Sequence, residues 1–376
     1  MTTLRANPSD VYEVVSKKAV PGDTVELESG DYASLNLWNI KKSEPGVVVR
    51  PAKGAAGKLS GINANGSSWL EFQGFTIQTP GGNGIMAIGG NDLLFRDITV
   101  TSSVDRNGQG FFIRNSKRVT VTACFFEGLG AGGTVMDSQA STVRNSTFTE
   151  IATDGVILAG AKDCVVEGNG FRSFYPPKGA HPDAVQVFST SLGQSESLVI
   201  EDNLIERGYG EPIQGIFVED GADIAIRGNM LFGTMHNGIG IARTRGVSIV
   251  RNFLQSAPDM STRIIVRQSA DDVVIRDNAS PLVVIGVPGE AQPTNVVEAN
   301  TTKTSPAAPD DKAQYNAWAG SGTGVPPATS EPAPTSDDVS LLIKQVASLQ
   351  ERLTKAEAAL EKVISQLTTA ARVFDS

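Results

Sequence analysis

Histidine and cysteine are scarce in this chain, with two of each among 376 residues. His181 and His236 have no cysteine or histidine partner at ligand spacing, so we expect no transition-metal site. Cys124 and Cys164 fall at different places in the repeats described below, so we interpret them as free core thiols of a protein made in a reducing cytoplasm. Calcium held by rows of Asp and Glu is the remaining metal hypothesis, and no other cofactor is expected.

The chain also has no excess of positive charge and no long apolar run. Lys and Arg number 32 against 41 Asp and Glu, and this net charge of −9 argues against nucleic acid or anionic lipid as the main partner. No apolar run approaches the ~20 residues of a membrane span, and the start MTTLRANPSD has no signal-peptide core. We therefore expect cytoplasmic synthesis, followed by a place on a virion or outside the cell after lysis.

What the sequence does contain is a repeat. An asparagine follows a short Val- and Ile-rich run again and again, at intervals of 24, 34, 26, 23, 26 and 22 residues by subtraction. A period in the twenties is typical of a solenoid, and asparagine suits a sharp corner with left-handed backbone, where stacked copies can hydrogen-bond. Asp97 and Ala123 occupy the same place in earlier repeats. The recurring residues are Asn145, Asn169, Asn203, Asn229, Asn252, Asn278 and Asn300.

Each repeat contains two short alternating strands and no helical period, which favours parallel coils over βαβ units. The segment 8–20 has the pattern of a short amphipathic helix, so residues 1–20 are predicted to cap the solenoid formed by residues 21–302. PGDTVELESGDY (21–32), followed by GVVVRPA, resembles the first coil of the pectate-lyase-like (pectin lyase-like) superfamily. This resemblance spans residues 1–302. It implies an all-β, right-handed parallel β-helix in a superfamily of lyases, hydrolases, epimerases and non-catalytic binders.

The tail has a different pattern. Residues 303–336 are rich in Pro, Ala, Ser and Thr and are predicted to be a linker. Residues 337–371 are predicted to form an α-helical coiled coil, and Ile343 and Ile364 widen its apolar stripe, which favours a trimer over a dimer or docking on another helix. Its a and d positions are Val339, Leu342, Val346, Leu349, Leu353, Ala356, Leu360, Val363, Leu367 and Ala370.

A β-helix joined to a trimerising element resembles phage tail spikes. The sequence departs from them because no separate virion-binding domain precedes the β-helix. Attachment to other virion proteins would then use the coiled coil, the first coil or an adaptor.

Alignment of the repeats places Asp154, Asp183, Gln214 and Asn237 at one offset, directly before a strand. Coils stack ~4.8 Å apart, so the two carboxylates should interact and separate into an acid and a base or nucleophile acting on a sugar. A spacing of ~5 Å suits a retaining hydrolase. Lyase chemistry would need a base plus a cation. The alternative is that these polar residues only cap turns. The candidate cations are Lys178, Arg243 and Arg245.

The run HPDAVQ adds His181 and Gln186 to this candidate site, because similar H-x-D-x-x-Q runs occur in the superfamily that the chain resembles. It lies between two inserted loops, 174–182 and 189–197, and such loops often carry binding residues. Tyr175 and Tyr209 could stack on sugar rings there, and Glu219 and Asp220 add polar groups nearby.

The residues at the middle of the same strands form a second column along the solenoid. We expect their side chains to point outward and to form a contact between subunits, since exposed rows of apolar side chains mark partner surfaces. Its members are Phe112, Met136, Ile157, Gln186, Phe217 and Gly240.

The sequence thus favours an oligomeric β-helix spike that recognises a bacterial surface polysaccharide as part of a virion, and leaves open whether it also cuts the polymer. The alternatives are a stand-alone polysaccharide lyase, hydrolase or epimerase, and a non-catalytic fibre or adaptor.

Overall fold

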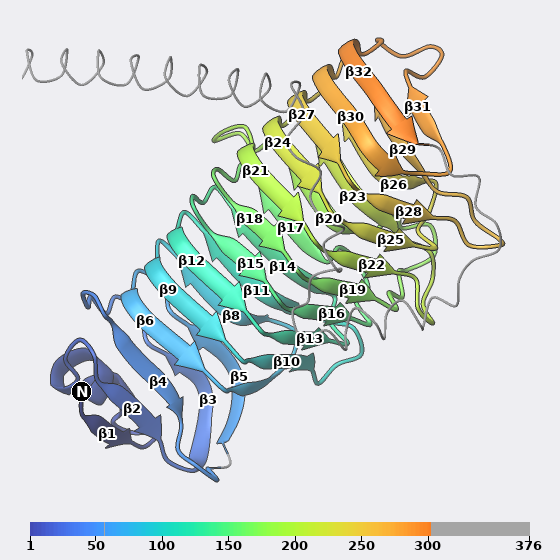
Figure 1. The fold of residues 1–376 in the computed structure, drawn as a ribbon. Coiled ribbons are helices and arrows are strands. Elements are labelled where there is room, and N and C mark those ends of the chain that lie inside the picture. The colour runs from blue at the N-terminus through green and yellow to red at the C-terminus, as the bar shows by residue number, and fades with distance from the viewer. Residues whose placement is uncertain (56, 302–376) are drawn as a thin grey trace, which may run out of the picture. The chain divides into compact units, whose positions relative to one another are not determined.

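The computed structural model describes residues 1–55 and 57–301, which form a parallel β-solenoid of about 13 turns. The predicted linker and coiled coil, residues 303–336 and 337–371, lie outside the described residues. Three parallel sheets run along the axis, and each strand pairs with its counterpart one coil away (Figure 1). Most coils therefore hold three strands, one more than the sequence predicted.

The first sheet consists of β1 (Thr3–Ala6), β2 (Thr24–Leu27), β4 (Val47–Pro51), β6 (Ser68–Gln73), β9 (Asn91–Arg96), β12 (Lys117–Thr122), β15 (Thr142–Arg144), β18 (Val165–Glu167), β21 (Glu196–Glu201), β24 (Ala222–Arg227), β27 (Arg245–Val250), β30 (Asp271–Ala279) and β32 (Thr294–Thr301). The second consists of β7 (Thr76–Thr79), β10 (Thr99–Ser102), β13 (Phe125–Glu127), β16 (Thr147–Thr149), β19 (Gly170–Arg172), β22 (Leu204–Glu206), β25 (Met230–Phe232) and β28 (Phe253–Gln255). The third consists of β3 (Gly30–Asn36), β5 (Gly57–Asn63), β8 (Asn83–Ile88), β11 (Gln109–Arg114), β14 (Ala131–Met136), β17 (Val156–Ala159), β20 (Asp183–Phe188), β23 (Gln214–Glu219), β26 (Asn237–Ala242), β29 (Arg263–Arg267) and β31 (Val283–Ile285).

The amino-terminal segment differs from the prediction. Residues 1–20 hold β1, which pairs with β2, followed by a helix formed by α1 (Val11–Glu13) and the π-helical η1 (Val14–Lys18). The helix is short because its apolar stripe is short, with Val11, Val14 and Val15 buried. The Lys42 ammonium donates to the carbonyls of Ser16 and Ala19 at the end of this helix. Its role as a cap remains a prediction.

The corner between the first and second sheets carries an asparagine ladder. Each ladder residue accepts the backbone N–H of its neighbour one coil earlier, as Asn229 does from Asn203 at 3.1 Å, and the side-chain amides form a second row of bonds. The residue before each ladder position from Ser146 to Asn278 has positive φ, for example Asp202 at 54°. The ladder is Ser146, Asn169, Asn203, Asn229, Asn252, Asn278 and Asn300.

Asn145 was assigned to this ladder incorrectly. It has a φ of 49° and occupies the left-handed corner itself, whereas Ser146 takes the buried ladder place and accepts the N–H of Cys124. Asparagine suits both adjacent positions, so the sequence pattern does not distinguish them.

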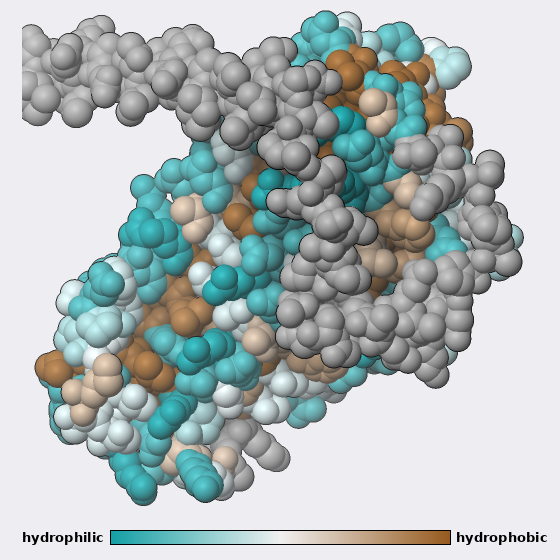
Figure 2. Space-filling view, viewed as in Figure 1, coloured by the Kyte–Doolittle hydropathy of each residue, from teal (hydrophilic) through white to brown (hydrophobic). Residues whose placement is uncertain are grey.

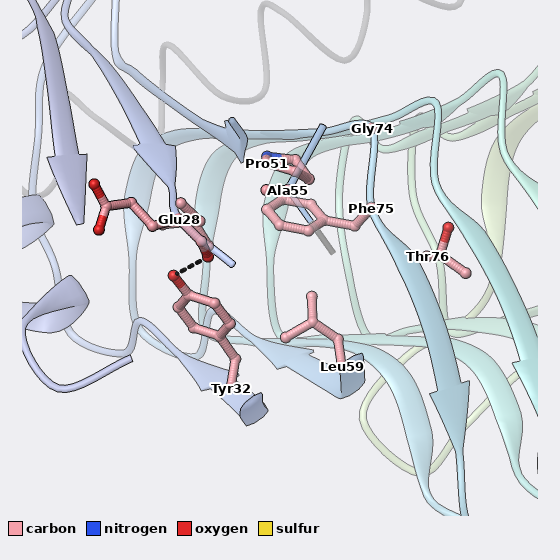
Figure 3. A pocket seen from close by; sticks show the side chains of 9 residues that line it. Glu28, Tyr32, Pro51, Ala55, Leu59, Gly74, Phe75 and Thr76 are labelled. Atoms are coloured by element: carbon pink, nitrogen blue, oxygen red, sulfur yellow. Dashed lines mark hydrogen bonds between the residues drawn. The ribbon is translucent and has the colours of Figure 1, made fainter. Parts of the chain in front are cut away.

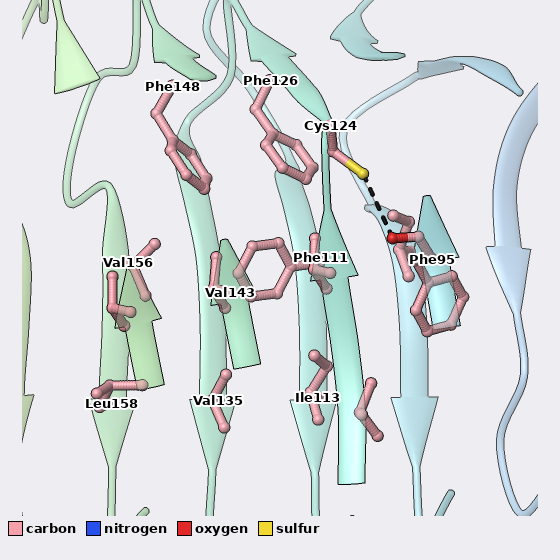
Figure 4. Close-up of a cluster of buried hydrophobic side chains, with 14 of the residues drawn as sticks. Phe95, Phe111, Ile113, Cys124, Phe126, Val135, Val143, Phe148, Val156 and Leu158 are labelled. Carbon is pink, nitrogen blue, oxygen red and sulfur yellow. Dashed lines mark hydrogen bonds between the residues drawn. The ribbon is translucent and has the colours of Figure 1, made fainter. Parts of the chain in front are cut away.

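The interior is filled by aromatic and aliphatic side chains stacked from coil to coil. Phe148 lies between Phe126 and Phe171, with ring centroids 4.9 Å away on both sides. Figure 4 shows the Phe126 and Phe148 rings side by side. Both cysteines are free and buried, as predicted. Burial raises the pKa of Cys124 to about 12 and that of Cys164 to about 11, so both thiols stay protonated at neutral pH.

The last described coil is less well covered. β31 pairs only with β29 and β32 only with β30 among the described residues. Apolar side chains gather around β30 and β32 in Figure 2, and Leu282, Ile285 and Val297 are exposed. No helix in the described part of the chain is long and apolar enough to cross a membrane.

Candidate functional site

The two predicted columns lie on the outer face of the third sheet, defined here as the side of β11, β14, β17, β20, β23 and β26 that faces away from the core. The other candidates lie in loops, at strand ends or in the first sheet. Alternation along β20 directs Val185 and Val187 into the core and leaves Gln186 and Phe188 partly exposed. The strands pair in register, so outward residues of successive coils form columns along the solenoid axis.

The first column is the polar one that the sequence alignment predicted. Asp183 pairs with Gln214, and the Asn237 amide donates to the Gln214 side-chain oxygen at 2.7 Å. One coil earlier, Asp154 Oδ1 accepts the backbone N–H of Asp183 at 2.8 Å. The structure therefore brings Asp154, Asp183, Gln214 and Asn237 together on adjacent coils.

A tight corner holds this column in place. Gly155 follows Asp154, and a Cβ added to it would lie 2.5 Å from the carbonyl oxygen of Ala184 and 2.6 Å from the Phe171 ring. The same close approach recurs at Gly132, Gly215 and Gly238. At these four corners glycine allows the backbone to approach the core this closely, whereas the equivalent position in the coil of Asp183 is the buried Ala184.

Asp183 is the unusual member. Its residue is 1% exposed, and its Oδ1 is buried without a hydrogen-bond partner among the described residues. Burial raises the pKa of Asp183 well above its usual value, and the nearby charges of Asp154 and Glu219 raise it further. Burial and the two neighbouring carboxylates thus favour the protonated form of Asp183, the form that can donate a proton.

Asp154 is held differently. Burial raises its pKa, but the hydrogen bond from the Asp183 N–H opposes that shift. This bond is the contact expected of every member of the column if these polar residues only cap turns. Asp183 does not repeat it, because the Gln214 N–H donates to the Pro182 carbonyl instead. Turn capping thus explains Asp154 and leaves the burial of Asp183 without a structural reason.

The raised pKa of Asp183 predicts a pH dependence of stability. The folded pKa lies above the unfolded value of ~3.9, so folding takes up a proton between these values, and the free energy of unfolding falls as pH rises through that window. Asp183→Asn should remove this slope and be more stable than the wild type at neutral pH. Urea unfolding from pH 4 to 8 tests this, with exposed Asp223→Asn as control. An unchanged slope in Asp183→Asn would contradict it.

The loop before β20 carries three predicted residues, and a fourth lies in the next coil. His181 and Lys178 are exposed, and Tyr209, from the next coil, is 91% exposed. Tyr175 is half-buried beneath the Arg106 guanidinium, whose carbon lies 4.5 Å from the ring centroid. Arg106 was missed in the sequence because it belongs to a loop three coils earlier.

The other predicted charges lie at the far end of the strands. Glu219 and Asp220 both bind Arg243, which also donates to Gln268, so these charges already have partners. Arg245 begins β27 in the first sheet and pairs with Ala222 and Asp271, away from the outer face of the third sheet.

The apolar column needs one correction. Thr134 pairs with Phe112 and Ile157, so it occupies the place assigned to Met136, which lies two residues farther along β14. A shift of two residues preserves the inward and outward alternation, which is why the pattern does not detect it. The column is Phe112, Thr134, Ile157, Gln186, Phe217 and Gly240.

No group of three or more His, Cys, Asp or Glu side chains among residues 1–55 and 57–301 is placed to hold a metal ion. A separate pocket of about 270 Å³ lies near the amino-terminal end, where the first coils lack a second-sheet strand (Figure 3). Tyr32 projects into it and donates to the Glu28 carbonyl at 2.9 Å. None of the predicted site residues lines this pocket.

Comparisons with known proteins agree with this fold. The family model described as a right-handed β-helix region matches residues 60–176. No curated protein matches the sequence significantly.

Two solved structures resemble the chain over most of its length. A mannuronic acid specific polysaccharide family 6 lyase from human gut microbiota has 14% identity and a TM-score of 0.58, covering 81% of this chain and 83% of the lyase. A lacto-N-biosidase from Eubacterium ramulus has 10% identity and a TM-score of 0.56, covering 80% of this chain and 67% of the enzyme. At these identities the likeness concerns the fold, and it confirms the predicted right-handed parallel β-helix.

Proposed function

We propose that this protein binds a polysaccharide on the outer face of the third sheet and hydrolyses it with Asp183 and Asp154. The observation that carries the proposal is the buried carboxyl of Asp183, whose Oδ1 has no hydrogen-bond partner among the described residues, next to Asp154, which accepts the Asp183 backbone N–H. Burying an unpaired polar group destabilises a protein, and such groups concentrate at functional sites. The two similar structures named above are, by their names, enzymes acting on sugars, which agrees with this proposal.

In the proposed reaction Asp183 gives its proton to the glycosidic oxygen as the bond from the anomeric carbon to that oxygen breaks. Asp154 would be the ionised partner: burial raises its pKa too, but it is less buried than Asp183 and the hydrogen bond from the Asp183 N–H opposes the shift. Adjacent coils are ~4.8 Å apart, close to the ~5–5.5 Å between carboxyls of retaining hydrolases. Asp154 would then bond to the anomeric carbon, and Asp183, now ionised, would activate the water that releases the product with retained configuration.

The test is product release from bacterial capsular, exopolysaccharide and uronate polymers. New reducing ends without unsaturated uronates support hydrolysis. Unsaturated uronates would replace it with lyase chemistry, in which a cation such as Lys178 or Arg106 neutralises the sugar carboxylate. Binding without any product would contradict hydrolysis. The protein would then be a non-catalytic receptor-binding protein, and Asp154 and Asp183 would have only a structural role.

The finer proposal is a trimeric spike on a virion, with other virion proteins as partners. It rests on the heptad pattern of residues 339–370 and on the apolar column of the outer face. We expect the full chain to sediment as a trimer and a chain ending at residue 336 as a smaller species. A monomeric full chain would contradict the spike and leave a stand-alone enzyme.

A further inference from the structure

A second cleft, with polar side chains around a largely apolar lining, lies at the opposite ends of the strands that begin at the acid pair. Its volume is about 370 Å³, and it spans the corners that follow β11, β14 and β17. A hairpin from the next coil, in which Thr190 and Gly193 pair, forms one wall. The lining side chains used below are Asn115, Lys117, Asp137, Gln139, Lys162 and Leu192.

This wall is fixed by hydrogen bonds to coils on both sides. Thr190 Oγ1 donates to Asp137 Oδ1 at 2.5 Å, across two coils, and Gln194 Nε2 donates to the Asp220 carbonyl at 3.0 Å. Gly160 makes room for the first contact, because a Cβ there would lie 2.6 Å from Asp137 Oδ1 and 2.7 Å from Thr190 Oγ1. The hairpin is therefore positioned before any ligand arrives.

The cleft and the acid pair share the same two strands. β17 follows Asp154 and ends beside Gly160, and β20 begins at Asp183 and ends just before the hairpin. Six residues of extended chain place the two ends of β20 about 17 Å apart. The same coil thus carries an inserted loop at each end, and between them lies the partly exposed surface of Ile157 and Gln186.

The lining suits a chain of hydroxyl-bearing rings. Asn115 offers both donors and acceptors, and Gln139 keeps an acceptor while its amide donates to Asp163 at 2.9 Å. Asp137 already accepts Thr190 and helps to hold the wall. Lys117 is exposed at the rim, whereas Lys162 is already paired with Glu196 at 2.9 Å. Leu192, 69% exposed at the tip of the hairpin, offers an apolar surface for the C–H face of a ring.

We infer that this cleft is a distal saccharide subsite, which holds the same polysaccharide several units away from the bond cut between Asp154 and Asp183. The inference rests on the proposed function. It means that the polymer runs parallel to β17 and β20, and that chains long enough to reach both ends of these strands bind more tightly than short ones.

The experiment compares long and short oligosaccharides of a polymer that the wild type cuts. Gly193→Trp fills the cleft, and an added Cβ has room there because its nearest neighbour is Lys162 Cε at 3.8 Å. Lys117→Ala removes a polar contact without filling space. Lys17→Ala, on the amino-terminal helix, is the matched control.

Both cleft variants are expected to raise KM for long chains about tenfold, with kcat and the KM for the shortest cleaved chains unchanged. Equal effects on long and short chains, or none on either, would overturn the subsite while leaving the acid pair in place. Loss of turnover confined to Asp183→Asn would then still support the proposed function. A wild type that neither binds nor cuts any polymer overturns both.

Discussion

Replacing Asp183 by asparagine is expected to lower kcat on the cleaved polysaccharide by about 10²–10⁴-fold while the protein stays folded. Asparagine keeps the shape of the side chain but has no acidic proton to give to the leaving oxygen. KM should change little, because the outer face that binds the polymer is untouched. Steady-state kinetics by reducing-end release measures the effect.

The comparison variants make this result specific. Asp154→Asn should lose at least as much activity, since it removes the proposed nucleophile, and Asp223→Asn, an exposed aspartate of the first sheet, should keep full activity. Full activity in Asp183→Asn would remove this residue from the mechanism. A large loss of activity together with higher stability at neutral pH would identify a group retained for chemistry rather than for folding.

Phe148→Ala is expected to lower the free energy of unfolding by about 3–5 kcal/mol. The ring is fully buried and stacks on two others, so its removal leaves a cavity that three coils border. Phe112→Ala is the control, because this ring lies on the outer face and is only partly buried. We expect it to cost less than half as much in urea unfolding.

Equal losses in the two variants would contradict the placement of these rings. Equal losses would mean that a core ring of the second sheet and an outer-face ring of the third sheet contribute alike, which the burial of Phe148 and the partial exposure of Phe112 do not allow.

The repeats were sufficient to predict the fold class, because a solenoid repeats the same short-range contacts in every coil. Positions within one coil were harder to predict. Asn145 was placed one residue away from the ladder, since the corner and ladder residues are adjacent and both accept asparagine. Met136 was placed two residues away from its column, since strand alternation is blind to such a shift.

The sequence predicted which site residues align between adjacent coils, but not how deeply each side chain is buried. Asp154 and Asp183 occupy the same position in their repeats, and this was the basis for predicting that they are neighbours. That Asp183 is buried while His181, two residues earlier, is exposed depends on how the loop before β20 folds back. Arg106 stacks on Tyr175 from a loop three coils away. Neither loop has a local sequence pattern that predicts this contact.

The two insertions of a single coil have a wider consequence. Because every strand pairs only with its counterparts in adjacent coils, the loop before β20 and the hairpin after it change length without shifting any strand on either side. The frame and the loops can therefore vary independently. Exchange of these two segments between β-helices of this kind should transfer substrate preference in one step, which makes this coil the natural place to graft a new specificity.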